Sequence, residues 1–312
     1  MIAVAIDTGG TKIAGAAINE NGEILEKNHI DNVERTGPFI LNSYFKIVDL
    51  FQAKYHIDTI GVGAGGRIDP LTGEVVYAVD LYREYIGIPL KTRLEEKYCK
   101  PVTVDNDCRL AVIGEKWLGA IRSYNNVFGL IIGTGIGGGL LLNGASVSGT
   151  KGGFGEIGHA ILHPHGRHCL CGQFGCVEKY VSGTALWQRY NELKEKSQIQ
   201  ITSGYEFFSC VRQNDPAAQK VLCEFIEDLT LCAVTCANLY DPQALFFGGG
   251  ILDTSDLWWD AFVKEYELQS NPHLQKIELI RTILGNNAPL LGAAYVAFEA
   301  CGNPSDLMNC YD

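Results

Sequence analysis

The sequence predicts an α/β protein built from two related lobes. An apolar run at residues 2–7 stops at a glycine turn, and a second apolar run follows at 13–18. The same order of strand, glycine turn and strand returns at residues 126–142, about 125 residues further along the chain. This repeat is typical of two lobes that each begin with a hairpin, and 312 residues are ample for two cores.

The other elements follow from the spacing of apolar residues. Short apolar runs predict buried strands, and apolar residues at helical spacing predict helices. We therefore expect further strands at residues 23–29, 59–64, 101–104 and 244–247, and helices at 36–54, 107–118, 177–194, 204–213, 215–239 and 288–300.

Composition and charge exclude several classes of protein. The net charge of −11 and the pI near 5.1 disfavour binding to nucleic acid, whose phosphates an acidic surface repels. No apolar run reaches the roughly 20 residues that a membrane helix needs, and the N-terminus lacks the basic region of a secretory signal. We therefore expect a cytoplasmic protein with no membrane partner, whose eleven cysteines are reduced thiols.

The first turn, DTGGTK at residues 7–12, has the composition of a phosphate-binding loop. Its two glycines allow phosphate oxygens to approach backbone N–H groups without a Cβ in the way. The hydroxyls of Thr8 and Thr11 can add hydrogen bonds, and Asp7 at the strand end suits Mg²⁺, either directly or through water. An ordinary hairpin with a glycine turn is the alternative.

The second turn, GTGIGGG at residues 133–139, partly matches a dinucleotide fingerprint. A strand rather than a helix is expected after it, so it lacks the helix N-terminus that would bind a pyrophosphate. The turn still offers backbone N–H groups, and two such turns facing each other can hold one polyphosphate. Taken alone, it is equally well explained as a plain hairpin turn.

The stretch VDND at residues 104–107 places a carboxylate where a helix begins. Asp107 is a candidate for the base that accepts the proton of an alcohol during phosphoryl transfer, a task for which an ordinary aspartate pKa suffices. The alternative is that Asp107 merely caps the helix. We expect a purely structural role for Asp105.

One histidine and three cysteines match the ligand set of a closed tetrahedral zinc site, namely His159, Cys169, Cys171 and Cys176. Because such a site has no open position, the zinc ion would be structural and would hold a long loop in shape. Three further histidines compete as the nitrogen ligand on spacing alone, namely His163, His165 and His168. The flanking Glu156 and Glu178 suit sugar hydroxyls, or are exposed surface carboxylates.

Taken together, these motifs resemble the ROK family (repressors, open reading frames and kinases), which belongs to the actin-like ATPase superfamily. DTGGTK and GTGIGGG look like its two phosphate loops, and DND looks like the strand end that carries the base. GEIGH and CLCGQFGCVEKYVSG, within residues 155–183, are close to the family signature, and ALFFGGGI at 244–251 looks like its adenosine-binding turn. The resemblance covers the whole chain.

The resemblance implies an ATP-dependent kinase that phosphorylates the 6-hydroxyl of a hexose or N-acetylhexosamine, with Asp107 as general base. The implied sugar-binding residues are Gly66, Arg67, Asn106, Glu156, His159 and Glu178. The implied ATP-binding residues are Asp7, Gly9, Gly10, Thr11, Lys12, Thr134, Gly135, Gly249 and Gly250, with Mg²⁺ near Asp7. The implied zinc ligands are His159, Cys169, Cys171 and Cys176.

The implied fold is two actin-like, ribonuclease H-like lobes with a cleft that closes on the substrate and excludes water. The small lobe would comprise residues 1–118 and 291–312, because the last helix returns to it. The large lobe would comprise residues 119–290 and include the zinc loop. Since family members are commonly homodimers or homotetramers, a second copy of the chain is an expected partner.

The stretch around Arg67 resembles that of N-acetylmannosamine kinases, in which a Gly-Arg pair contacts the sugar. The HPHG stretch at residues 163–166 resembles bacterial members of the same group. Glucose-phosphorylating members usually carry Gly-Pro in the first region, and an Asn-Leu pair where this chain has Asp80-Leu81. We therefore expect N-acetylmannosamine as the substrate, with glucose or a broad range of hexoses as the alternative. For Arg67 itself, the alternative is a surface cation or an ion pair with Asp69.

A sugar-sensing repressor of the same family is the alternative from another class. Such repressors carry an added N-terminal winged helix, whereas here the first phosphate loop begins at residue 7. The acidic charge and the full set of base and phosphate-loop residues also favour the kinase. We therefore expect no DNA-binding domain. A scaffold of the actin type would have no use for the predicted sugar ligands.

Overall fold

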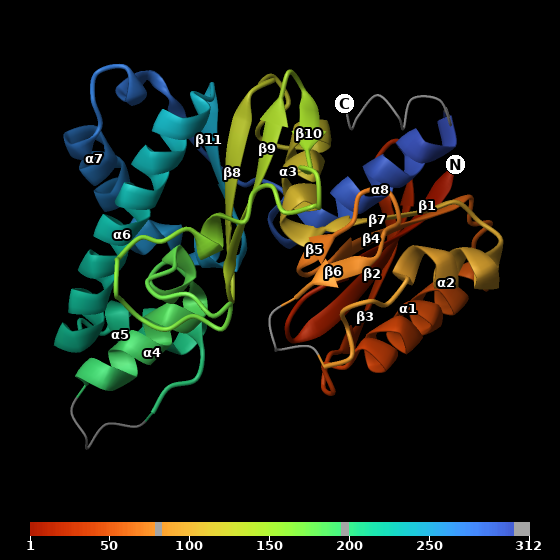
Figure 1. The fold of residues 1–312 in the computed structure, drawn as a ribbon, viewed down its shortest axis with the longest axis horizontal. Helices are drawn as coiled ribbons and strands as arrows, with labels where there is room; N and C mark the ends of the chain where they lie inside the picture. The colour runs from red at the N-terminus through yellow and green to blue at the C-terminus, as the bar shows by residue number, and fades with distance from the viewer. Residues whose placement is uncertain (79–82, 195–199, 303–312) are drawn as a thin grey trace. The chain divides into compact units, whose positions relative to one another are not determined.

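The computed structural model describes residues 1–78, 83–194 and 200–302 of the chain (Figure 1). The Asp80-Leu81 pair, which bears on the choice between glucose and N-acetylmannosamine, lies outside the described residues. Within these ranges, no helix combines the length and the apolar character that crossing a membrane requires.

The chain folds as two compact units. The first unit comprises residues 1–125, 139–155 and the described residues from 286 on, and the second comprises 126–138 and 156–285. The chain therefore enters and leaves the second unit twice. The predicted division at residues 118/119 and 290/291 differs from this one, because it assigns residues 119–125, 139–155 and 286–290 to the large lobe.

The first unit contains a five-stranded sheet of order β3-β2-β1-β4-β7. These strands are β1 (Ile2–Thr8), β2 (Lys12–Asn19), β3 (Ile24–Asp31), β4 (Thr59–Ala64) and β7 (Val102–Asn106). Strands β1 to β3 form an antiparallel meander, and β4 and β7 join it in parallel. A separate antiparallel pair is formed by β5 (Arg67–Ile68) and β6 (Val75–Tyr77).

Helices pack on both faces of this sheet, as alternation along β4 shows. Ile60 and Val62 lie in the core shared with α1 (Gly37–Gln52) and α2 (Leu90–Tyr98). Gly61 between them faces the opposite side, where a Cβ on it would lie only 2.0 Å from the carbonyl oxygen of Ala293 in α8 (Ala288–Gly302). Helix α8 also packs along α3 (Asp107–Leu118), which directly follows β7.

A second sheet has the order β10-β9-β8-β11-β12. Its strands are β8 (Val127–Ile132), β9 (Ile136–Leu142), β10 (Ala145–Val147), β11 (Ala244–Gly248) and β12 (Glu278–Arg281). Strands β8, β11 and β12 belong to the second unit, and the chain passes into the first unit within β9. The helices are α4 (Gly183–Leu193), α5 (Gly204–Arg212), the long α6 (Pro216–Tyr240) and α7 (Trp259–Gln269) (Figure 1). The 3-10 helices of the second unit are η1 (Ile157–His159), η2 (Val177–Lys179), η3 (Gly250–Leu257) and η4 (Leu274–Lys276), and η5 (Gly285–Asn287) stands where the chain returns to the first unit.

The two sheets have the same strand order. In each, a meander of three strands is followed by two further strands that add in parallel beside the first strand. In each, a glycine-rich turn joins the first two strands of the meander. The predicted repeat of strand, glycine turn and strand is therefore confirmed.

The predicted helix at 177–194 is wrong in its first part. Val177–Lys179 forms a single 3-10 turn, and the α-helix begins only at Gly183. Ser182 has extended backbone angles (φ −148°), and its side chain accepts a hydrogen bond from the N–H of Ala185. Since an N-cap residue of this kind starts a helix, no continuous helix can run through it.

Candidate active site and metal centre

The turn between β1 and β2 is tight and glycine-dependent. The N–H of Gly9 donates to the carbonyl of Lys12 at 2.9 Å, and the Asn32 side chain donates to the carbonyl of Gly9 at 3.1 Å. Gly10 is half-buried and Thr11 is exposed. Thr8, in contrast, is 2% exposed, and its hydroxyl pairs with that of Tyr44 at 2.5 Å. The expectation that the Thr8 hydroxyl contacts a ligand is therefore wrong, because it belongs to the core.

Asp7 lies close to Asp107, the predicted base. It lies near the end of β1, paired with Gly63 of β4, and its pKa is raised to about 7. Burial of the carboxyl is the largest cause, followed by repulsion from Asp107, while Lys12 and Lys27 act in the opposite direction. Two of the predicted site residues, far apart in the sequence, are thus within electrostatic reach of each other.

Strand β7 ends at Asn106 and helix α3 begins at Asp107, and the two residues have different hydrogen bonds. Asn106 caps α3, since its side-chain oxygen accepts from the N–H groups of Cys108 (3.0 Å) and Arg109 (3.1 Å). Its amide nitrogen donates to the carbonyl of Gly66 at 3.0 Å. Asp107 is the first helical residue, and its Oδ1 accepts from the N–H of Cys108 at 2.9 Å. The residue that caps α3 is therefore Asn106, and not Asp107.

The guanidinium of Arg67 lies between Tyr77 and Gly153. Its guanidinium carbon lies 5.4 Å from the centre of the Tyr77 ring. A Cβ on Gly153 would lie 3.2 Å from its Nε, so the backbone at Gly153 packs closely against the guanidinium. The Asp69 carboxylate instead accepts from the N–H groups of Leu71 and Thr72, both at 2.9 Å, and these bonds lower its pKa. The Asp69 carboxylate therefore stabilises its own turn, in place of the ion pair with Arg67 that was the alternative from the sequence.

In the second unit, the turn between β8 and β9 is fastened to the start of α4. Gly183 donates to the carbonyl of Gly133 at 2.8 Å, and Thr184 donates to that of Thr134 at 3.2 Å. A Cβ on Gly135 would lie 2.4 Å from Oε2 of Glu178. The structure thus places a predicted sugar ligand, Glu178, directly against a predicted phosphate turn.

The glycines after β11 also form a close backbone approach. Gly249 has φ +88°, and a Cβ on it would lie 2.4 Å from the carbonyl oxygen of Ile132 at the end of β8. Gly250 begins η3. Because only glycine fits both the backbone angle and the space at residue 249, the turn between β11 and η3 is fixed by the sequence.

Four predicted zinc ligands come together in the loop between η1 and η2. The ligand atoms of His159, Cys169, Cys171 and Cys176 all lie within 4.8 Å of one another. The sulfurs of Cys171 and Cys176 are 3.6 Å apart, and the sulfur of Cys169 is 3.8 Å from Nδ1 of His159. Tetrahedral zinc with Zn–S bonds of roughly 2.3 Å places its ligand atoms about 3.8 Å apart, so the cluster has a suitable size.

The chemistry of the cluster also suits a cation. Burial, followed by the neighbouring Cys171 and Cys169, raises the pKa of the Cys176 thiol to about 12. Thiolates gathered in this way require a positive charge among them, which a bound metal ion supplies. Nε2 of His159 faces the Glu156 carboxylate at 3.8 Å, and a carboxylate in this place can orient a ligating imidazole.

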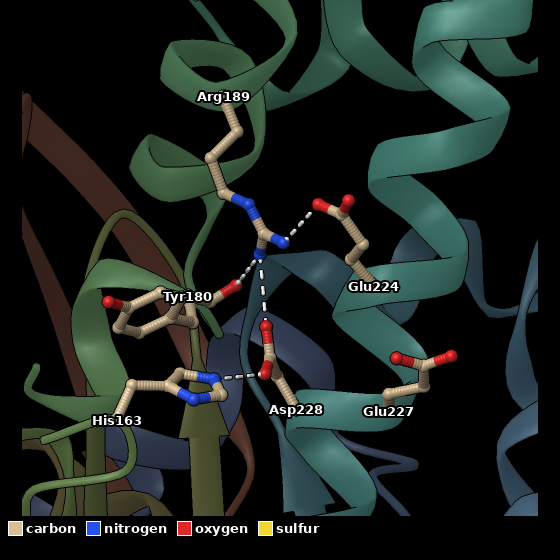
Figure 2. A pocket seen from close by; sticks show the side chains of 6 residues that line it. All are labelled: His163, Tyr180, Arg189, Glu224, Glu227 and Asp228. Carbon is tan, nitrogen blue, oxygen red and sulfur yellow. Dashed lines mark hydrogen bonds and ion pairs between the residues drawn. The ribbon is translucent and has the colours of Figure 1, made fainter. Parts of the chain in front are cut away.

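The competing histidines lie elsewhere. His163 pairs with Asp228 of α6, with 2.6 Å between Nε2 and Oδ1 (Figure 2). His168 packs edge-on against Phe174, with ring centres 5.1 Å apart. Among the described residues, His159 is therefore the histidine that groups with the three cysteines.

His163 lines a pocket of about 260 Å³ together with Tyr180, Arg189, Glu224, Glu227 and Asp228. The buried Arg189 donates to Glu224 at 2.6 Å, and to Asp228 and the carbonyl of Tyr180 at 3.2 Å each (Figure 2). The pair of His163 and Asp228 therefore links the loop to α6, and the ion pairs of Arg189 link α6 to α4.

The two sheets have the same strand order, and in each a glycine-rich turn joins the first two strands. This is the α/β fold of ROK sugar kinases, which resembles that of actin-like ATPases. The chain belongs to the ROK family, whose model matches residues 3–300. It is 31% identical to a glucokinase of Streptomyces coelicolor, over 96% of this chain and 98% of that protein.

Two solved structures show the same fold. A ROK family glucokinase from Streptomyces griseus, in complex with glucose and AMPPNP, matches with a TM-score of 0.86 and 28% identity, over 96% of this chain and all of that chain. A provisionally assigned N-acetylmannosamine kinase from Listeria monocytogenes matches with a TM-score of 0.85 and 27% identity, over 97% of this chain and 100% of the other.

Proposed function

We propose that this ROK protein transfers the γ-phosphoryl group of ATP to the 6-hydroxyl of a hexose. The observation that carries the proposal is the pair of carboxylates in the first unit. Asp107 at the start of α3 raises the pKa of Asp7, which lies at the end of β1 just before the first glycine turn. A base and a phosphate-binding turn are thus brought together, as phosphoryl transfer to an alcohol requires.

Each residue then has a defined task. Asp107 accepts a hydrogen bond from the sugar hydroxyl and takes its proton as the phosphoryl group arrives. Asn106 uses one amide hydrogen for Gly66, so its second can be donated to the sugar. Further sugar hydroxyls are bound by Gly66, Arg67, Glu156, His159 and Glu178.

The nucleotide is bound through backbone N–H groups. We assign the phosphates to the turn at Gly9, Gly10, Thr11 and Lys12 and to that at Thr134 and Gly135, and the adenosine to Gly249 and Gly250. When bound with ATP, Mg²⁺ neutralises phosphate charge, and Asp7 is the carboxylate placed to hold it. The cluster of His159 and three cysteines is assigned to a structural zinc ion, because all four positions are taken by protein donors.

N-acetylmannosamine is the substrate we favour, on the basis of Arg67. Its guanidinium is held in place between Tyr77 and Gly153, and its Nε has no hydrogen-bond partner among the described residues. A guanidinium has several donors for an oxygen such as that of an acetamido group. Glucose is the second candidate, which the similarity to the glucokinases supports.

The test is an ADP-release assay over glucose, mannose, N-acetylglucosamine, N-acetylmannosamine and fructose, with kcat/KM measured for each sugar. We expect ADP release to depend on the sugar and to be highest for N-acetylmannosamine. A clear preference for glucose would contradict N-acetylmannosamine as the substrate but would still support the kinase activity. No sugar-dependent ADP release would contradict the kinase itself.

A further inference from the structure

Arg109 is a buried cation that the proposed chemistry does not use. It lies in the first turn of α3, two residues after Asp107, and is 1% exposed. An unpaired charge in such a place would be strongly unfavourable, so its partners must be part of the structure.

The first partner is Asp105, on the other side of the base. Nε of Arg109 donates to Oδ1 of Asp105 at 2.9 Å, and Nη2 donates to the same oxygen. This oxygen also accepts from the N–H of Asn106 at 2.6 Å. The pair therefore spans the junction of β7 and α3, with Asp107 between its two members.

The second partner is a glycine loop, defined here as residues 149–155. Nη1 of Arg109 donates to the carbonyl of Gly152 at 2.9 Å. Gly152 has φ +64°, and a Cβ on it would lie 1.8 Å from the carbonyl oxygen of Ile68, so the loop lies directly on β5. The next residue, Gly153, is the one that packs against the guanidinium of Arg67.

We infer that Arg109 is a positioning residue for the sugar. Its planar guanidinium joins the strand end that carries the base to the loop that fixes Arg67, and Glu156 directly follows this loop in the chain. The role rests on the proposed function, because it concerns the placement of the acceptor. Loss of the link should therefore impair sugar binding and leave ATP binding nearly unchanged.

Arg109→Lys is the first test. A lysine keeps the charge, but a single ammonium group cannot donate to Asp105 and Gly152 in the geometry of the planar guanidinium. We expect the KM for the preferred sugar to rise about tenfold or more, since small displacements of a bound substrate have large kinetic effects. The KM for ATP should stay within about twofold. Arg109→Gln, which removes the buried charge, should show the same separation.

Arg189→Lys is the matched control. Arg189 is also a buried, ion-paired arginine (6% exposed), but it lies in α4 of the second unit. We expect a similar loss of thermal stability without the rise in sugar KM. If both variants change the sugar KM equally, or if Arg109→Lys changes the two KM values together, Arg109 is only structural.

Hydrogen exchange gives a readout that does not depend on turnover. Amides of residues 149–155 should exchange faster in Arg109→Lys than in the wild type, and at the wild-type rate in Arg189→Lys. Unchanged exchange in Arg109→Lys would overturn the inference. A wild-type chain that phosphorylates no hexose would contradict the proposed function, and exchange in this loop would then decide alone whether Arg109 holds it.

Discussion

Asn106 caps α3, whereas Asp107 next to it is the proposed base, and the sequence alone does not distinguish the two. Both are residue types that cap helices, and both stand where β7 passes into α3. The backbone angles decide between them, since Asn106 is extended (φ −66°, ψ 136°) and Asp107 is already helical. The sequence VDND was enough to identify Asp107 as a candidate base. It does not identify the N-cap, because that depends on the residue at which the backbone becomes helical, and both residue types are compatible with the position.

Asp107→Asn tests the assignment of the base. The amide keeps the side-chain oxygen that accepts from Cys108 but cannot take a proton, so we expect kcat to fall by about 10²- to 10⁴-fold. Sugar binding, measured calorimetrically, should remain close to that of the wild type. Asp31→Asn is the control, because Asp31 lies in β3 of the same unit and its side chain is 76% exposed. Wild-type turnover in Asp107→Asn would show that another group is the base.

The raised pKa of Asp7 predicts that the stability of the protein depends on pH. Its pKa rises from an ordinary 3.8 to about 7 on folding, so the folded state retains a proton that the unfolded state has lost between these values. The contribution of Asp7 to stability therefore decreases as pH rises through this window. In metal-free buffer, we expect Asp7→Asn to gain Tm relative to the wild type between pH 5 and pH 8. An equal difference between the two proteins at both pH values would contradict this.

Thr8 shows what residue-scale reasoning from sequence lacks. It stands inside a phosphate-loop motif, yet its hydroxyl pairs with Tyr44 in the core. Alternation along β1 places it on the same face as Val4 and Ile6, which pack with Tyr44 of α1, but no local spacing identifies Tyr44 as the partner. Arg109 was missed for a related reason. Its spacing of four residues from Asp105 suggests an ion pair, but its contact with Gly152 joins distant parts of the chain.

At the scale of elements, the loop between η1 and η2 carries the four proposed zinc ligands. It has short 3-10 turns at its ends and isolated bridges within it, such as that between His168 and Phe174. Its backbone hydrogen bonds belong to turns and to these bridges, such as that from Leu162 to the carbonyl of Gly175 at 2.8 Å, so the proposed zinc ion would add a cross-link to the loop.

Cys171→Ser tests this metal centre. We expect bound zinc, measured by elemental analysis of the purified protein, to fall from about one ion per chain to nearly none, because a serine hydroxyl is a poor zinc ligand. Cys223→Ser is the control, since Cys223 is an exposed cysteine in α6 of the same unit. Full zinc occupancy in Cys171→Ser would exclude this residue as a ligand.

Long elements with regular spacing were predictable, and short or interrupted ones were not. Helix α6 and strands β1, β4 and β8 lie where their apolar patterns predict them. Helix α2 was not predicted, because it has only three buried residues, Leu90, Leu94 and Tyr98, in a charged segment. Strand β12 has four residues, none of them buried, and it exists because β11 supplies a parallel partner.

For the whole molecule, α8 is the element that completes the first unit. It approaches α3 and β4 through glycines, as a Cβ on Gly292 would lie 1.8 Å from the carbonyl oxygen of Leu110, and one on Gly114 would lie 2.1 Å from that of Ala288. Such backbone contact leaves no room for a side chain. The return of residues 139–155 to the first unit is also a property of the whole fold, and local periodicity contains no trace of it.

Gly292→Val tests this packing. The added side chain must push α8 away from α3, so we expect the free energy of unfolding to fall by about 1–3 kcal/mol. Gly302→Val is the control at the end of the same helix, where a Cβ has no atom within 4 Å. Urea unfolding of the two variants should show a lower midpoint only for Gly292→Val. Equal midpoints would mean that α8 can move without cost.

The position of α8 has a consequence for the birth of the protein on the ribosome. Strands β1 to β4 leave the ribosome long before α8, which packs on β4. One side of the nascent sheet therefore stays uncovered until α8 has been made, and during that time it is exposed to chaperones and to aggregation. A premature stop codon ahead of α8 would thus damage a part of the protein that was made much earlier.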